Sequence, residues 1–204
     1  MEPLPFLTKG ILLGLSIAIP VGPIGLLCIR RTLAQGQLMG LASGLGAATA
    51  DGLYGLVGAF GLTLVADLLV DQTVWLRLIG GLFLCYLGIT TFSAKPAEAA
   101  ANVTSRGLFG AYASTFALTL TNPATILSFI AIFAGLGIAE SGSGRFGASL
   151  TVIGVFLGSA LWWVLLSWGV NLFRTSFSPK RLRWLNRLAG LAIFAFGIVA
   201  LTVR

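Results

Sequence analysis

Long apolar stretches alternate with short polar segments along the whole chain. A helix that crosses the hydrocarbon core of a bilayer needs about 20 apolar residues, because each residue adds about 1.5 Å to its length. A membrane barrel would instead show apolar and polar positions alternating along short strands, and the sequence lacks that pattern. We therefore predict an all-α polytopic membrane protein with six transmembrane helices. The predicted spans are Phe6–Ile29, Leu38–Ala66, Val74–Phe92, Leu108–Leu136, Phe146–Phe173 and Trp184–Val203.

The composition supports this prediction. Of the 204 residues, 57% are hydrophobic and 9% are charged, whereas a soluble domain carries about 25% charged residues. So few charges do not cover a water-facing surface, and we expect one transmembrane domain over residues 1–204 in contact with the lipid bilayer. The formal net charge of +7 does not indicate nucleic-acid binding, because the basic residues lie between apolar spans, where they set membrane orientation.

These basic residues are distributed unequally between the two sides of the six spans. Nine of them lie on one side and four on the other. Because cytoplasmic loops carry the excess of Lys and Arg, this bias predicts that both termini face outward. The richer side holds Arg30, Arg31, Lys95, Arg106, Arg174, Lys180, Arg181, Arg183 and Arg187, and the poorer side holds Lys9, Arg77, Arg145 and Arg204.

The two halves of the chain contain related segments. VWLRLIGGLFLCYLGI (residues 74–89) aligns without a gap with RWLNRLAGLAIFAFGI (residues 183–198), which pairs Gly81 with Gly190 and Gly88 with Gly197. Earlier in each half, IPVGPIGLLCI corresponds to LTNPATILSFI. Convergent apolar sequence is the alternative, but the shared order of a broken span, a long span and a Trp-led span favours a duplication.

Each half contains three predicted spans, so two equivalent halves must enter the membrane from opposite sides. This predicts inverted repeats over residues 6–93 and 107–203, with proline-broken helices 1 and 4. In secondary transporters of this architecture, the substrate site lies where interrupted helices meet near the membrane midplane.

Two proline-containing breaks interrupt the first span of each half. Pro20, Gly22 and Pro23 form the first break, and Asn122 and Pro123 form the second. Asn is a favoured N-cap residue, and proline suits the first position of a helix. A helix that starts within the membrane presents N–H groups and a partial positive charge, which suit a carboxylate. A packing kink without a ligand is the alternative, but two breaks at equivalent positions predict a polar substrate pocket.

Asp51 stands midway along the second predicted span, with no other charged residue in that run. A carboxylate near the bilayer centre costs at least about 2.5 kcal/mol, so it marks a functional site by default. On a helix, Asp51 shares its face with Gly44, Ala48 and Gly55, which predicts that it points into the bundle. A structural hydrogen bond to Tyr54 is the alternative. We predict that Asp51 and Tyr54 contribute to substrate binding and that Asp51 couples transport to protons.

No catalytic, metal or cofactor site is expected. The sequence contains no histidine, which removes the commonest metal ligand. Cys28 and Cys85 lie in separate apolar runs without a CxxC pattern, so we predict packed thiols rather than a disulfide. A thiol–disulfide electron carrier of the DsbD/CcdA type would need a cysteine in each broken span, but Ser128 stands where the partner of Cys28 would be.

The segments around the breaks resemble a known family. PVGPIGLLCIRRTLAQGQLMGLASGLGAATADGLYG resembles the N-terminal signature of the LysE family of amino-acid exporters, and TNPATILSFIAIFAG resembles the asparagine–proline segment of its second half. The resemblance implies export of lysine, arginine or other small amino acids and metabolites across the bacterial inner membrane, driven by the proton gradient. Many relatives read Thr-Pro-Gly-Pro at the first break, where this chain has Pro-Val-Gly-Pro. Carried over residue by residue, the resemblance points to Pro20, Gly22, Pro23, Asp51, Asn122 and Pro123.

The residues and the resemblance lead to one hypothesis, which is alternating access by a secondary-active exporter. The carboxylate of the cargo would bind at the helix starts near Pro23 and Pro123 and its ammonium at Asp51, and the two halves would rock around that site. A carboxyl group binds either a proton or an ammonium, so Asp51 is the predicted coupling group. An inorganic-cation exporter with Asp51 as the ligand is the alternative, although no clustered carboxylates accompany it. A homodimer is also left open.

Overall fold

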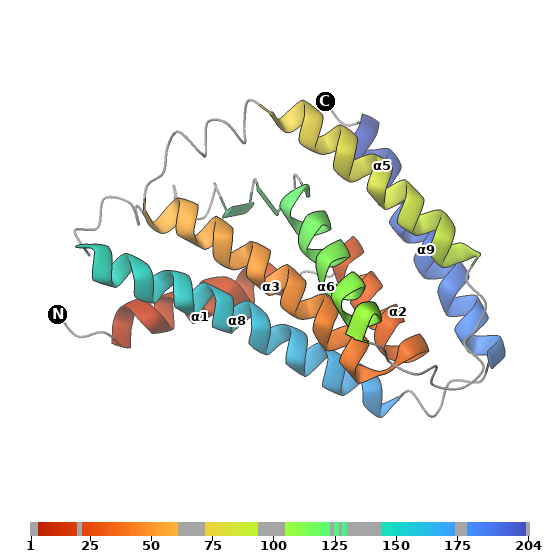
Figure 1. Ribbon diagram of the computed structural model, residues 1–204, viewed down its shortest axis with the longest axis horizontal. Helices are drawn as coiled ribbons and strands as arrows, with labels where there is room; N and C mark the ends of the chain where they lie inside the picture. The colour runs from red at the N-terminus through yellow and green to blue at the C-terminus, as the bar shows by residue number, and fades with distance from the viewer. Residues whose placement is uncertain are drawn as a thin grey trace.

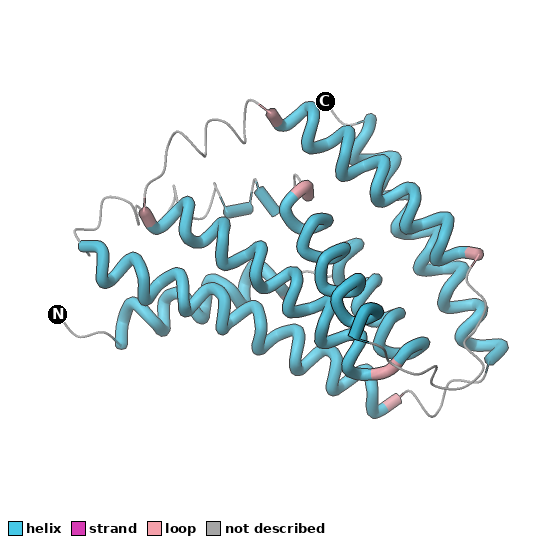
Figure 2. Tube along the Cα trace, viewed as in Figure 1, coloured by secondary structure: helices cyan, strands magenta, loops and turns pink. Residues whose placement is uncertain are grey.

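The computed structural model describes residues 4–19, 22–60, 72–93, 105–122, 125–126, 128–129, 144–173 and 179–202. These residues lie almost entirely in helices (Figures 1 and 2). The all-helical class is therefore confirmed for this part of the chain. Seven helices are described from end to end: α1 (Leu4–Ala18), α2 (Pro23–Gln35), α3 (Gln37–Ala59), α5 (Thr73–Phe92), α6 (Ser105–Leu120), α8 (Gly144–Leu172) and α9 (Pro179–Thr202).

The first predicted break is confirmed, because the chain turns sharply between α1 and α2. The axes of these helices differ by 82°. Gly22 occupies the N-cap of α2 with an extended backbone, and Pro23 follows at the first helical position. Proline fits there because its missing N–H would have no intrahelical partner. Pro20, the other proline of this break, lies outside the described residues.

The second break is also visible on its N-terminal side. Helix α6 ends at Leu120, and Asn122 then accepts backbone hydrogen bonds from Thr125 N (3.1 Å) and Ile126 N (3.2 Å). These two bonds start a new helical turn with Asn122 at its N-cap. The Asn122 side-chain nitrogen donates to Thr125 Oγ1 at 3.0 Å. Pro123 lies outside the described residues.

The first two predicted spans leave residues 30–37 between them as a loop, and this prediction is wrong. Helix α2 continues to Gln35, and Gly36 alone separates it from α3. Residues 30–35 contain no helix breaker, whereas Gly36 has a φ of 104°, a conformation that glycine adopts without steric cost. Arg30 and Arg31 therefore belong to the last turns of a helix rather than to a solvated loop.

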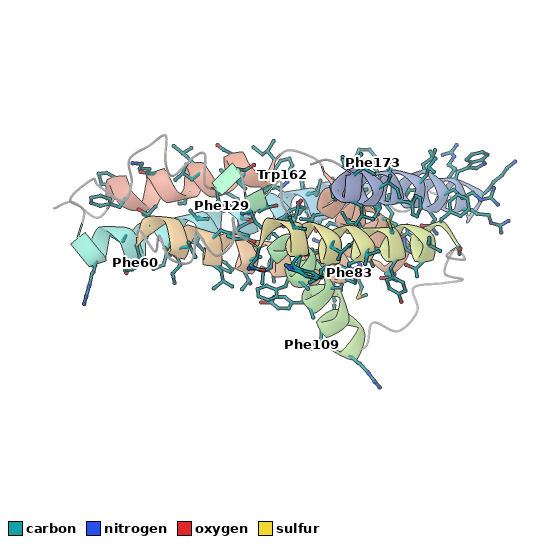
Figure 3. The ribbon with its side chains drawn as sticks, turned by 90° about the horizontal axis from the view of Figure 1, so that it is seen from above. Phe60, Phe83, Phe109, Phe129, Trp162 and Phe173 are labelled. Atoms are coloured by element: carbon teal, nitrogen blue, oxygen red, sulfur yellow. The ribbon has the colours of Figure 1, made fainter. Side chains whose placement is uncertain are left out.

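Within the described residues, three segments meet the length and hydropathy expected of membrane spans. Arg145–Leu172 and Arg183–Thr202 do so as single helices, and the bent pair of α1 and α2 does so as one broken span. Leu78–Phe92 is apolar but shorter. Large apolar side chains face outward from several helices, and Figure 3 marks Phe60, Phe109 and Phe173 among them. Such an outer surface suits lipid rather than water.

Glycines bring the helices into close contact. On α1 and α8, a Cβ added to Gly10 would meet Gly154 Cα at 2.8 Å, and one added to Gly14 would meet the backbone of Val155. On α5 and α9, a Cβ on Gly81 would meet Gly197 O at 3.1 Å. Small residues of this kind let helix backbones approach each other within a membrane, where no hydrophobic effect drives association.

The helix ends are sorted between the two ends of the molecule. Figure 1 shows the C-terminal ends of α2, α5 and α8 and the N-terminal ends of α3, α6 and α9 gathered toward the lower right. The sequence places its excess of Lys and Arg at these ends. Helix α1 starts at the opposite end and leads to the first break, whereas α6 starts at the lower right and leads to the second (Figure 1).

Candidate functional site

A small polar cavity lies where the two breaks meet α3 and α8. It is lined by Gly22 and Pro23 from the first break, Asn122 from the second, and Asp51 from α3. The cavity has a volume of about 70 Å³, room for several water molecules, since one water needs about 10–15 Å³. The rest of its wall consists of Ile17, Ala18, Ile24, Gly25, Ala47, Thr119, Thr125 and Trp163.

Asp51 is held in this cavity by a chain of hydrogen bonds from α8. Its side chain is 3% exposed, and Ser159 Oγ donates to its Oδ2 at 2.6 Å. Trp163 Nε1 in turn donates to Ser159 Oγ at 3.1 Å. The other carboxylate oxygen, Oδ1, accepts no hydrogen bond from the described residues. One oxygen is thus fixed by the protein, while the second is left for a ligand or a proton.

Small residues on α3 place Asp51 against α8, as its helical spacing predicts. Gly44, Ala48 and Gly55 are buried on the same face. A Cβ on Gly44 would collide with the Trp163 side chain, and one on Gly55 would lie 3.2 Å from Val155. Larger side chains would push the two helices apart and carry Asp51 away from its partner on α8.

The start of α2 supplies a second kind of group to the cavity. Ile24 and Gly25 follow Pro23 in the first helical turn and both line the cavity. Their backbone N–H groups have no acceptor four residues earlier in the helix, and none is found for them among the described residues. Helix-start N–H groups with a partial positive charge bind carboxylates and other anions. The cavity therefore combines an anion-binding backbone with a carboxylate.

Tyr54 does not line the cavity. Its hydroxyl donates to Leu120 O at 2.6 Å, and its ring lies 5.4 Å from that of Phe129 between centroids. Leu120 is the last residue of α6, whose terminal carbonyl has no intrahelical donor. Tyr54 thus stabilises the end of the helix that precedes the second break, and it does not donate to Asp51. The contribution of Tyr54 to substrate binding therefore stays a prediction, and its observed contact is with the end of α6.

Tyr54→Phe is expected to lower the free energy of unfolding by about 1–3 kcal/mol, because it leaves a partly buried carbonyl without a donor. Thermal unfolding of the purified protein, followed by tryptophan fluorescence, measures the change. Tyr112→Phe is the matched control: it removes a 3.0 Å bond to Thr49 Oγ1, but Thr49 keeps its own bond to Leu45 O. Equal melting temperatures for wild type and Tyr54→Phe would refute the capping role.

Ser159 and Trp163 are the site residues that the sequence pattern did not reveal. Both lie about a hundred residues from Asp51, and a Ser or Trp in an apolar helix carries no signal of its own. The internal repeat could have indicated Ser159. The offset that relates Trp75 to Trp184 takes Asp51 to position 160, next to Ser159.

Cys28 and Cys85 are both free thiols, as predicted. Cys28 is fully buried in the core beside Leu27 and Ala47. Neither cysteine lines the cavity of Asp51.

Apolar helices that are interrupted around a buried polar cavity are typical of helical membrane transporters. The chain belongs to the LysE type translocator family, whose model matches residues 15–204. It is 31% identical over 192 residues to "Putative amino acid efflux protein YcgF" of Bacillus subtilis (strain 168), which covers 92% of this chain and 90% of that protein. It is 26% identical over 174 residues to "Uncharacterized membrane protein YahN" of Escherichia coli (strain K12), and that alignment covers 83% of this chain and 77% of that protein. No solved structure matches the chain.

The predicted family is thereby confirmed, and the protein is a multi-pass membrane transporter. The comparisons support amino-acid export in general terms.

Proposed function

We propose that this protein is a secondary-active exporter that carries small amino acids out of the bacterial cytoplasm across the inner membrane, with both termini outside. Transport is coupled to the proton gradient and proceeds by alternating access. One observation carries this proposal: Asp51 and the start of α2 line the same buried cavity. A free amino acid carries an ammonium and a carboxylate on one carbon, and the cavity presents a complementary group for each.

In the proposed complex, the cargo carboxylate accepts hydrogen bonds from the Ile24 and Gly25 N–H groups. The second break lies across the cavity, where Asn122 and Thr125 add polar side chains. The cargo ammonium donates to Asp51 Oδ1, the oxygen that Ser159 leaves unoccupied. Charge-assisted hydrogen bonds of this kind are about twice as strong as neutral ones.

The same carboxylate accounts for proton coupling. Among the described residues Asp51 is the only acidic one, so it alone can exchange a proton for the cargo ammonium there. Proton binding from outside displaces the ammonium into the external solution, and proton release to the cytoplasm makes the carboxylate ready for the next cargo molecule. This cycle moves cargo outward as protons move inward.

Helix packing supports the proposed inverted repeats. Gly81 lies against Gly197, and a Cβ on Gly190 would meet Gly88 O at 2.7 Å. Gly81 is the repeat counterpart of Gly190, and Gly88 is that of Gly197. Exchanging each glycine for its repeat counterpart therefore turns the contact of Gly81 with Gly197 into the contact of Gly190 with Gly88. Two contacts related in this way are the property of a two-fold interface. The same relation holds for two helix pairs, because α1 packs on α8 and α6 packs on α3. In the proposed repeats, α6 is the counterpart of α1 and α8 is the counterpart of α3.

Efflux from proteoliposomes tests the proposal. Vesicles containing the purified protein are loaded with one labelled amino acid at a time, and its release is followed with and without a pH gradient. At least one small amino acid is expected to leave faster than from protein-free vesicles and to leave faster still when the gradient favours proton entry in exchange. If no amino acid is released above the protein-free control, the proposed function is wrong.

A further inference from the structure

A second and larger cavity lies between α2, α5 and α6, at the end of the molecule that carries the basic excess. It has a volume of about 310 Å³. Its polar wall consists of Arg30, Arg31, Gln35, Thr90 and Thr91, and the cavity of Asp51 shares none of these residues. We refer to it as the arginine vestibule.

Arg31 fixes one wall of the vestibule. Its Nη1 donates to Ser43 Oγ (2.8 Å), Ala111 O (2.9 Å) and Thr115 Oγ1 (2.9 Å), and its Nη2 donates to Ser114 Oγ (2.8 Å). These bonds join α2 to α3 and α6. All four acceptors are neutral, so Arg31 is positioned without being neutralised.

Arg30 and Gln35 leave hydrogen-bonding capacity unused. Arg30 Nε donates to Asn186 Oδ1 at 3.3 Å, and its two terminal nitrogens have no hydrogen bond among the described residues. Gln35 Oε1 is buried and also has no hydrogen-bond partner among the described residues. The amide of Gln35 can rotate to present its NH2 group instead. A ligand that accepts hydrogen bonds would satisfy both side chains.

The vestibule carries two adjacent positive charges and no carboxylate from the described residues. Five of the six acidic residues lie outside the described part, and Asp51 lines the other cavity. Positive charges that are partly removed from water are costly unless an anion accompanies them. A guanidinium group matches the two oxygens of a carboxylate in geometry as well as in charge.

We propose that the arginine vestibule is a receiving site for the carboxylate of the cargo, on its way from the cytoplasm to Asp51, and that it selects amino acids without a net positive charge. This inference rests on the proposed export function. Helix α2 connects the two cavities: Leu27 lines the vestibule, and Ile24 and Gly25 line the cavity of Asp51. Arg30 lies about 10 Å along the helix from Pro23, at about 1.5 Å per residue. The carboxylate thus moves from guanidinium groups to backbone N–H groups along one helix, and lysine or arginine is repelled at the first step.

The test compares labelled alanine, glutamate and lysine in the efflux assay, using wild type and Arg30→Gln. Wild type is expected to release alanine or glutamate at least about fivefold faster than lysine, because one nearby charge contributes on the order of a fivefold difference in rate or affinity. Arg30→Gln is expected to shift the lysine-to-alanine ratio toward lysine by a similar factor. Arg183→Gln removes an exposed charge from α9 and is expected to leave that ratio unchanged. Arg30→Lys keeps the charge and is expected to keep the discrimination.

If the wild-type protein releases lysine faster than alanine and glutamate, this inference is wrong while amino-acid export still holds. That measurement uses the wild-type protein alone, so it does not depend on whether a variant folds. An unchanged ratio in Arg30→Gln would overturn it as well. The vestibule could instead hold a lipid phosphate. The assay is therefore repeated in vesicles of neutral and of anionic lipids; discrimination that appears only with anionic lipids would assign the vestibule to the lipid headgroup and refute cargo binding.

Discussion

Asp51→Asn is expected to abolish transport driven by a pH gradient while the protein remains folded. The amide has nearly the shape of the carboxylate and its oxygen still accepts the hydrogen bond of Ser159. It cannot bind a proton in exchange for cargo, nor can it pair with an ammonium as a full charge. Hydrogen bonds to charged groups contribute about 1.5–3 kcal/mol, so cargo affinity is expected to fall about ten- to hundredfold. Uphill efflux and equilibrium binding measure the two losses.

Two further variants at this site separate charge from packing. Asp51→Glu keeps the charge and is expected to retain some coupled efflux with an altered substrate preference, because the longer side chain moves the charge. Ser159→Ala is expected to reduce but not abolish efflux, since it leaves the carboxylate in place without its orienting donor. Coupled efflux at the wild-type rate in Asp51→Asn would assign Asp51 a packing role.

Gly154→Ala is expected to cause a large loss of stability. The added Cβ would lie 2.7 Å from Gly10 Cα and 2.8 Å from Ile11 N, and both neighbours are backbone atoms that cannot turn aside. Overpacking of this kind costs about 1–3 kcal/mol. Because α1 leads into the first break, a displaced α1 is also expected to slow efflux. Thermal unfolding and efflux of the purified variant test both effects.

Gly169→Ala is the matched control on the same helix. A Cβ there would meet no atom within 4 Å, and alanine is favoured over glycine in a helix by about 1 kcal/mol. This variant is therefore expected to be as stable as wild type or slightly more so. Similar melting temperatures for Gly154→Ala and Gly169→Ala would contradict the close contact of α1 with α8.

The part of the site that could be predicted from the sequence is the part with local signals. Gly22 and Pro23 change the backbone wherever they occur, and Asn122 is a strong cap, so both breaks follow from neighbouring residues. Asp51 stands out because a carboxylate is costly in an apolar helix. Its partners Ser159 and Trp163 are ordinary residues of a distant helix. Their role arises only when α8 packs on α3.

The sequence pattern places Arg30 and Arg31 wrongly, in a loop rather than in helix α2. Counting basic residues treats each one as a solvated loop charge, and neither this count nor hydropathy detects that the helix continues to Gln35. Arg31 also meets Ser and Thr side chains that the apolar pattern of α3 and α6 conceals. The boundary of a span is set by the next helix breaker, here Gly36, and not by its first charge.

A structure determined with a transported amino acid bound would test the central claim most directly. We expect the cargo ammonium within hydrogen-bonding distance, about 3 Å, of Asp51 Oδ1, and the cargo carboxylate at the Ile24 and Gly25 N–H groups. Amino acid bound elsewhere, with the cavity between the two breaks holding only water, would contradict the assignment of this cavity as the transport site.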